Sequence, residues 1–147
     1  MSYVDTSVMV KLYFKEEYSR EASNWLRKQG RAIPLTPFHE LEFTNAIKLK
    51  RFRKEMAKEE AEIVLKRFHE HERRGVFYRP QFHWADVFSL AIDLSRTHTE
   101  RIGARSLDVI HVASALAMDA DGFTTFDQRQ SKLAVNAGLR IEDCRKA

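Results

Sequence analysis

Residues 3–14, which read YVDTSVMVKLYF, decide the fold. The first two residues are apolar and form a short strand that stops at the polar triplet Asp5-Thr6-Ser7. Apolar side chains then recur at helical spacing as far as Phe14, and Thr6 or Ser7 can cap the start of that helix. This stretch therefore predicts a strand, a polar turn and a helix, with an acid at the carboxyl end of the strand.

The rest of the chain repeats this alternation of short strands and helices. Apolar runs bounded by turn residues predict further strands at 32–35, 76–78, 122–126 and 139–141. Periodic segments between them predict helices at 17–29, 37–53, 57–74, 83–101, 106–118 and 128–137. Strands joined by helical crossovers run parallel, and the helices then cover both sides of the sheet. We therefore expect an α/β fold with a central, mostly parallel sheet of four to five short strands.

The composition is that of one soluble globular domain over residues 1–147. Of these residues 44% are hydrophobic, five are Gly and three are Pro, which excludes collagen-like and disordered chains. The longest uncharged stretch, 109–118, has ten residues, whereas a membrane helix needs about 20 apolar residues. The N-terminus has no signal-peptide pattern, and the single cysteine, Cys144, forms no internal disulfide. We expect a cytoplasmic protein.

Positive charge is concentrated in one region of the chain. The formal net charge is +4, and residues 48–79 hold eleven basic and six acidic side chains. The density is highest at the start of this region and would suit a polyanion such as nucleic acid. The candidate contact residues are Lys48, Lys50, Arg51 and Arg53. The alternative is a solvated helix face, because Glu59, Glu60 and Glu62 alternate with basic residues at spacings that allow surface ion pairs.

Two aspartates are expected at the carboxyl ends of strands. Asp5 ends the first strand and Asp127 ends the fourth, and each precedes a turn into a helix. In an open parallel sheet, functional sites lie beyond these carboxyl ends. Helix capping explains either aspartate equally well when it is considered alone, because Asp is a preferred N-cap residue.

A third acid, Glu42, lies within the helix that begins at Pro37. The face of this helix that we expect to be buried consists of Phe38, Leu41, Ala46, Leu49 and Phe52. Glu42 and Asn45 project to the middle of that face. A buried carboxylate needs a cation, a metal ion or several hydrogen bonds. Glu42 is therefore a candidate functional residue with Asn45 in support, and a structural ion pair with an internal arginine is the alternative.

The fourth acid, Asp108, lies in the first turn of the almost entirely apolar helix 106–118. A helix that is apolar on nearly every side belongs inside a domain, so this carboxylate is also out of place unless it has a function. The alternative is that it compensates the helix dipole, an effect of roughly 0.3–1 kcal/mol. On the same helix, His111 is interpreted as a hydrogen-bonded core residue and Ser114 as a packing residue.

Together, the acids Asp5, Glu42, Asp108 and Asp127 indicate a site for a hard metal ion. Carboxylates without Cys or paired His ligands favour Mg²⁺ or Mn²⁺ over zinc. Such ions activate water and orient a phosphate, which indicates phosphodiester hydrolysis. A phosphatase with Asp5 as nucleophile is a weaker alternative, because Ser7 stands where haloacid-dehalogenase-like phosphatases have a second aspartate. A module that binds RNA or a protein partner without cutting is the other alternative.

Four segments resemble the PIN-domain ribonucleases, and more narrowly the VapC toxins of bacterial toxin–antitoxin pairs. They are residues 5–7 (DTS), 42–47 (EFTNAI), 105–116 (RSLDVIHVASAL) and 124–130 (TTFDQRQ). These segments span nearly the whole chain in the order found in the family. The resemblance implies a three-layer α/β/α sandwich, an acidic Mg²⁺ or Mn²⁺ site and endoribonuclease activity.

The resemblance also assigns roles to individual residues. The catalytic acids and metal ligands that it implies are Asp5, Glu42, Asp108 and Asp127. Thr6 and Thr125 match small hydroxyl residues that help to hold the metal-bound water or the carboxylates. The implied partners are an RNA substrate, a cognate antitoxin that blocks the site, and a second copy of the chain in a homodimer. The basic residues from Lys48 onward are then expected to contact the RNA backbone or an acidic segment of the antitoxin.

Overall fold

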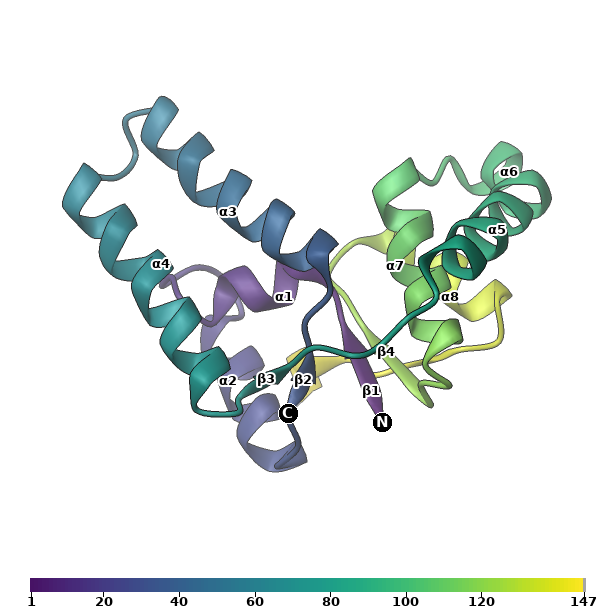
Figure 1. Cartoon of the computed structure of the whole chain (residues 1–147), viewed down its shortest axis with the longest axis horizontal. Coiled ribbons are helices and arrows are strands. Elements are labelled where there is room, and N and C mark those ends of the chain that lie inside the picture. Colours follow the sequence, from purple (N-terminus) through teal and green to yellow (C-terminus); the bar gives the residue numbers. More distant parts are fainter. Residues whose placement is uncertain (147) are drawn as a thin grey trace.

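The computed structural model describes residues 1–146 (Figure 1). The strands are β1 (Ser2–Val4), β2 (Ile33–Pro34), β3 (Phe77–Tyr78), β4 (Gly122–Thr124) and β5 (Arg140–Ile141). The helices are α1 (Thr6–Lys11), α2 (Ser19–Gln29), α3 (Pro37–Phe52), α4 (Lys58–Arg73), α5 (Trp84–Leu94), α6 (Glu100–Ile102), α7 (Ser106–Ala117) and α8 (Gln128–Asn136). A π-helical turn, η1 (Ser95–Thr99), joins α5 to α6, and a 3-10 helix, η2 (Cys144–Lys146), ends the described chain. The order of strands and helices is the predicted one.

The strands are parallel, as predicted, and they form two separate ladders. β4 lies between β1 and β5 and pairs with both of them. β2 pairs with β3 in a second ladder. The central sheet therefore has three hydrogen-bonded strands, and the two remaining predicted strands form their own pair beside it.

Pro34 and His39 explain the division between β1 and β2. The backbone N–H of Ile33 donates to the carbonyl of Val76, just before β3, at 2.9 Å, and that of Leu35 donates to the carbonyl of Tyr78 in β3, at 2.8 Å. Pro34, between them, faces the other way, towards β1, and proline has no N–H to donate. The carbonyl of Val4 on β1 is bonded instead to Nε2 of His39, at 2.8 Å. A side chain of α3 thus satisfies the backbone group that a continuous ladder would have used.

The central sheet separates two hydrophobic cores. Tyr3 packs with the core formed by α5, α7 and α8, whereas its neighbour Val4 packs with the core formed by α1 to α4. Successive side chains of a strand point to opposite faces of the sheet, which is why adjacent residues enter different cores. Figure 1 shows the two groups of helices on opposite sides of β1 and β4. Within residues 1–146, no helix is both long and apolar enough to cross a membrane.

The buried face of α3 differs from the predicted one. His39, Phe43 and Ile47 are fully buried, and Phe43 stacks on Phe68 of α4 with ring centroids 4.2 Å apart. Three residues of the predicted face are instead exposed by 61%, 39% and 83%, namely Leu41, Leu49 and Phe52. The prediction is wrong because it considered one helix alone, whereas contacts with α1, α4 and β1 decide which stripe is buried.

Candidate active site

Asp5 and Asp127 lie beyond the carboxyl ends of the paired strands β1 and β4. Asp5 caps α1, since its Oδ1 accepts a hydrogen bond from the backbone N–H of Val8 at 3.2 Å. Asp127 caps α8, and its Oδ1 accepts from the backbone N–H groups of Arg129 and Gln130 at 2.8 and 3.0 Å. Each aspartate therefore serves as an N-cap and also stands at the edge of a parallel sheet where functional sites form.

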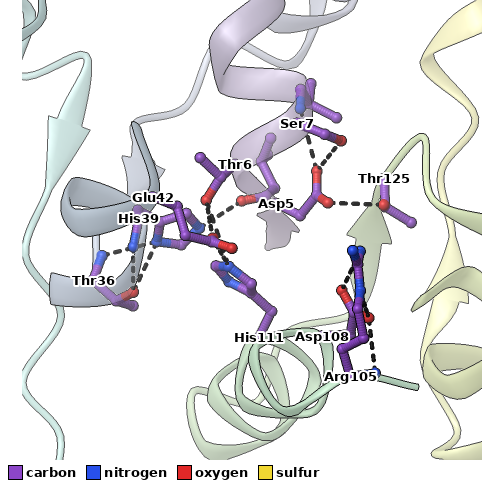
Figure 2. A network of polar contacts seen from close by, with 12 residues as sticks. Asp5, Thr6, Ser7, Thr36, His39, Glu42, Arg105, Asp108, His111 and Thr125 are labelled. Atoms are coloured by element: carbon purple, nitrogen blue, oxygen red, sulfur yellow. Dashed lines mark hydrogen bonds and ion pairs between the residues drawn. The ribbon is translucent and has the colours of Figure 1, made fainter. Parts of the chain in front are cut away.

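The carboxylate of Asp5 is buried among hydrogen-bond donors (Figure 2). Ser7 Oγ donates to its Oδ1 at 2.7 Å, and Thr125 Oγ1 donates to its Oδ2 at 2.9 Å. Thr125 Oγ1 also accepts from the backbone N–H of Asp127 at 3.0 Å, so one hydroxyl connects the ends of both strands. Burial raises the pKa of Asp5 in spite of these donors, and a nearby cation would favour its charged form.

Glu42 enters the site from α3 and points inward, as predicted. Its Oε2 accepts hydrogen bonds from Thr6 Oγ1 at 2.6 Å and from His111 Nε2 at 2.5 Å. Burial alone would raise the pKa of Glu42, but the hydrogen bond and charge of His111 and the hydrogen bond from Thr6 hold it below its ordinary value. The internal partner of Glu42 is therefore chiefly a histidine rather than the arginine considered from the sequence.

His111 connects this site to the core. It is buried and hydrogen-bonded, as the sequence interpretation holds, and its Nδ1 lies 2.8 Å from Oη of Tyr3. Its Nε2 carries the hydrogen in the bond to Glu42, because a carboxylate only accepts. The sequence interpretation missed this contact with an acid. The sequence feature that could have predicted it is the position of His111 three residues after Asp108, which places both residues on the same side of the helix.

Arg105 is a second site residue that the sequence interpretation missed. Its Nε donates to Oδ2 of Asp108 at 3.1 Å, and its Nη2 donates to Oδ2 of Asp127 at 3.4 Å. The backbone N–H of Arg105 also donates to Asp108 Oδ2, at 3.0 Å, and this bond caps α7. The hydrogen bonds and charge of Asp108, with the charge of Asp127, raise the pKa of Arg105. The spacing of three residues between Arg105 and Asp108 is the sequence feature that could have predicted their contact.

Glu42 and Asp108 line the same cavity, which has a volume of 340 Å³. It is lined by Glu42, Arg105, Ser106, Leu107 and Asp108. The four acids thus border one region of the molecule. Asp5 and Asp127 are connected through a threonine, Asp127 and Asp108 through an arginine, and Asp108 and Glu42 through this cavity.

The donor set has the chemistry of a site for a hard divalent ion. Carboxylate oxygens are the ligands that Mg²⁺ and Mn²⁺ prefer, and the buried charge of Asp5 would be stabilised by a cation. Within residues 1–146, no three His, Cys, Asp or Glu side chains stand close enough together to coordinate one ion. The guanidinium of Arg105 lies against both Asp108 and Asp127. The side chains would have to close around an ion that displaced it.

Two of the three predicted supporting residues belong to this cluster. Thr6 contacts Glu42, and Thr125 contacts Asp5. Asn45, one turn further along α3, is exposed to solvent and lies on the other side of the helix from the buried Phe43 stripe. Its predicted place on a buried face fails for the same reason as that of the apolar residues around it.

The basic candidates follow the acids along the second half of α3. They are Lys48, Lys50 and Arg51 within the helix and Arg53, its C-cap. Lys48 pairs with Glu62 at 3.0 Å, and Lys50 pairs with Glu16 at 2.8 Å, so part of this surface consists of ordinary ion pairs. Arg53 lies eleven positions after Glu42, or about 16 Å along the helix axis at 1.5 Å per residue.

Comparisons with known proteins agree with the fold described above. Residues 2–136 match the PIN domain family. A crystal structure of FitAcB from Neisseria gonorrhoeae contains a chain that is 12% identical, with a TM-score of 0.67 and 100% of both chains covered. No curated protein matches the sequence at a significant level. Because the family match extends over nearly the whole chain, the protein belongs to the PIN-domain family.

Proposed function

We propose that the protein is a metal-dependent endoribonuclease that acts as the toxin of a toxin–antitoxin pair. The observation that supports this most strongly is the set of four connected carboxylates at the carboxyl edge of the sheet of a PIN domain. Thr125 bonds the carboxylate of Asp5 and the backbone N–H of Asp127, Arg105 bonds the carboxylates of Asp127 and Asp108, and Glu42 lines a cavity together with Asp108. Acids gathered in this way repel one another unless a cation neutralises them.

The proposed ligands of a Mg²⁺ or Mn²⁺ ion are Asp5, Glu42, Asp108 and Asp127. When bound, such an ion supplies an activated water and stabilises the charge on a phosphate. Thr6 and His111 hold one oxygen of Glu42, and Thr125 holds one oxygen of Asp5. These hydrogen bonds orient one oxygen of Glu42 and one of Asp5 before an ion binds.

RNA is the proposed substrate, and the second half of α3 is the proposed contact with its backbone. The residues that would make this contact are Lys48, Lys50, Arg51 and Arg53. The motifs that resemble VapC toxins support a cognate antitoxin that covers the acids, and a homodimer.

The test is incubation of the purified protein with total cellular RNA in Mg²⁺, in Mn²⁺ and in EDTA, with the fragment ends mapped. Asp5→Asn and Asp108→Asn are expected to cleave at least about 100-fold more slowly, because removing one preorganised electrostatic group costs about 10²–10³ in kcat. Asp93→Asn is the matched control, since Asp93 on α5 is 73% exposed and lies outside the acidic cluster.

Discrete fragments that require the ion and both acids would support the proposed nuclease. If Asp5→Asn and Asp108→Asn both cleave RNA as fast as the wild type in the presence of the ion, the assignment of these acids is wrong. A folded protein that binds RNA but releases no fragments in either ion would favour the alternative, a PIN domain that binds without cutting.

A further inference from the structure

Arg105 is the only arginine or lysine within residues 1–146 that forms an ion pair with one of the four acids. Figure 2 shows its side chain beside Asp108. The guanidinium reaches Asp108 at 3.1 Å and Asp127 at 3.4 Å, and it also lines the cavity that contains Glu42. One cation of the protein itself therefore stands within the acidic cluster.

The position of Arg105 conflicts with that of a bound metal ion. Asp108 lies in the first turn of α7 and Asp127 precedes α8, so the guanidinium reduces the repulsion between two acids from different elements. A divalent cation would need oxygens of the same two carboxylates. Arg105 is bonded to Oδ2 of each carboxylate, so an ion that binds through these two oxygens would displace the guanidinium.

The attachment of Arg105 allows this movement. Its side chain is 64% exposed, and exposed ion pairs contribute little because solvent and salt compete with them. Its backbone N–H remains bonded to Asp108 as a helix cap, so α7 does not have to change when the side chain leaves. In contrast, Asp5 and Glu42 are held by hydrogen bonds from buried or half-buried groups.

We propose that Arg105 is a built-in counter-ion that competes with the divalent cation for Asp108 and Asp127. This inference rests on the metal site of the proposed function, and it states that Arg105 regulates the affinity of that site for the cation. In the cation-free protein the guanidinium stabilises the gathered acids. When the cation binds, the side chain withdraws, so the cation affinity is lower than the same carboxylates would have without Arg105.

The test measures Mn²⁺ binding to the metal-free protein by calorimetry and electron paramagnetic resonance, without RNA. Arg105→Gln removes the positive charge, and Arg105→Lys keeps it. Arg101→Gln is the control for net charge, since Arg101 on α6 contacts the carbonyl of Thr97 and none of the acids. We expect Arg105→Gln to bind Mn²⁺ roughly 3- to 30-fold more tightly than the wild type, and the other two variants to stay close to the wild type.

Thermal unfolding provides a second measurement. Without a cation, Arg105→Gln is expected to melt below the wild type, because the acids lose their counter-ion. Saturating Mn²⁺ is expected to remove or reverse that difference, because a ligand that binds the folded state more tightly stabilises it more. Arg101→Gln is expected to show neither effect.

The outcomes separate this inference from the proposed function. Equal or weaker Mn²⁺ binding by Arg105→Gln overturns the counter-ion role, while ion-dependent RNA cleavage by the wild type would leave the nuclease intact. Absence of Mn²⁺ binding by both the wild type and Arg105→Gln overturns the counter-ion role and the proposed metal site together.

Discussion

Glu42 carries both of its internal hydrogen bonds on one oxygen. Thr6 from α1 and His111 from α7 both donate to Oε2, and no residue of the described chain is bonded to Oε1. The same residue lines the cavity that it shares with Asp108. Two elements thus orient the carboxylate, and one of its oxygens stays available to a ligand.

The hydrogen bonds of His111 are expected to contribute to stability as well as to the site. His111→Leu removes the partner of the buried Tyr3 hydroxyl and one donor of Glu42, with an expected loss of about 1–3 kcal/mol in the free energy of unfolding. His111→Gln keeps a donor for Glu42 and is expected to recover part of that loss. Urea unfolding of the cation-free proteins measures both values, and equal stabilities of the two variants would contradict the role of the hydrogen bonds.

Asp5 is expected to make the cation-free protein less stable as the pH rises. Burial raises the pKa of Asp5 in the folded protein, so the folded state binds the proton more tightly than the unfolded chain does. This contribution is fully present below the unfolded pKa and is lost as the pH rises to the folded pKa. Asp5→Asn lacks the titration, so its stability relative to the wild type is expected to increase between about pH 4 and about pH 8.

Urea unfolding of the wild type and Asp5→Asn at both pH values, in EDTA, measures this difference. Asp93→Asn is a suitable control, because that exposed acid lies on α5 outside the site. A stability difference between Asp5→Asn and the wild type that does not change with pH would show that the buried carboxyl group does not titrate in this way.

At the scale of the element, α3 joins the site to one of the two cores. His39 near its start bonds to β1, and Phe43 and Ile47 continue the buried stripe at intervals of four residues. Glu42 is adjacent to this stripe, so the packing of Phe43 fixes the direction in which Glu42 points. Phe52, at the end of the helix, is 83% exposed and takes no part in the core.

Two phenylalanines of α3 are therefore expected to respond differently to truncation. Phe43→Ala removes a fully buried ring stacked on Phe68, with an expected loss of about 3–5 kcal/mol in the free energy of unfolding. Phe52→Ala is the matched control, and its expected effect is within about 0.5 kcal/mol. Denaturant unfolding of both variants measures these values. A larger loss for Phe52→Ala would support the helix face expected from the sequence.

At the scale of the whole molecule, the acidic cluster is assembled from both sides of the sheet. Glu42 comes from α3 on one side, Asp108 comes from α7 on the other, and Asp5 and Asp127 follow the strands between them. The excess positive charge lies on the first side, in residues 48–79. An RNA strand that reaches the acids from α3 would therefore cross this basic region.

If the basic region contacts RNA, binding is expected to weaken with salt in proportion to the number of phosphates contacted. For single strands, the logarithm of the affinity falls with the logarithm of salt concentration by about 0.7 per contact. Lys48→Ala combined with Arg53→Ala is expected to reduce this slope by about 1.4. The measurement is fluorescence anisotropy with a single-stranded RNA in EDTA, and Arg96→Ala combined with Arg101→Ala is the charge-matched control. Equal slopes for the two double variants would identify the region as a solvated face.

The sequence by itself determined the elements and the places of the acids along them. Asp5 and Asp127 follow apolar strands and cap helices in the structure, because caps and apolar periodicity act over only a few residues. The parallel direction of the strands follows from their helical connections, which brings both aspartates to one edge of the sheet. The inward direction of Glu42 was also predictable, although the face assigned around it was not.

Only the tertiary structure decided which side chains meet. His111 and Glu42 are 69 positions apart, and Arg105 reaches Asp127 across 22 positions. The buried stripe of α3 and the separate β2–β3 ladder likewise depend on the neighbours of each element, including the bond from His39 to β1. The periodicity of one helix records its own apolar residues and carries no information about which neighbour will cover them. Packing between elements therefore decides these contacts.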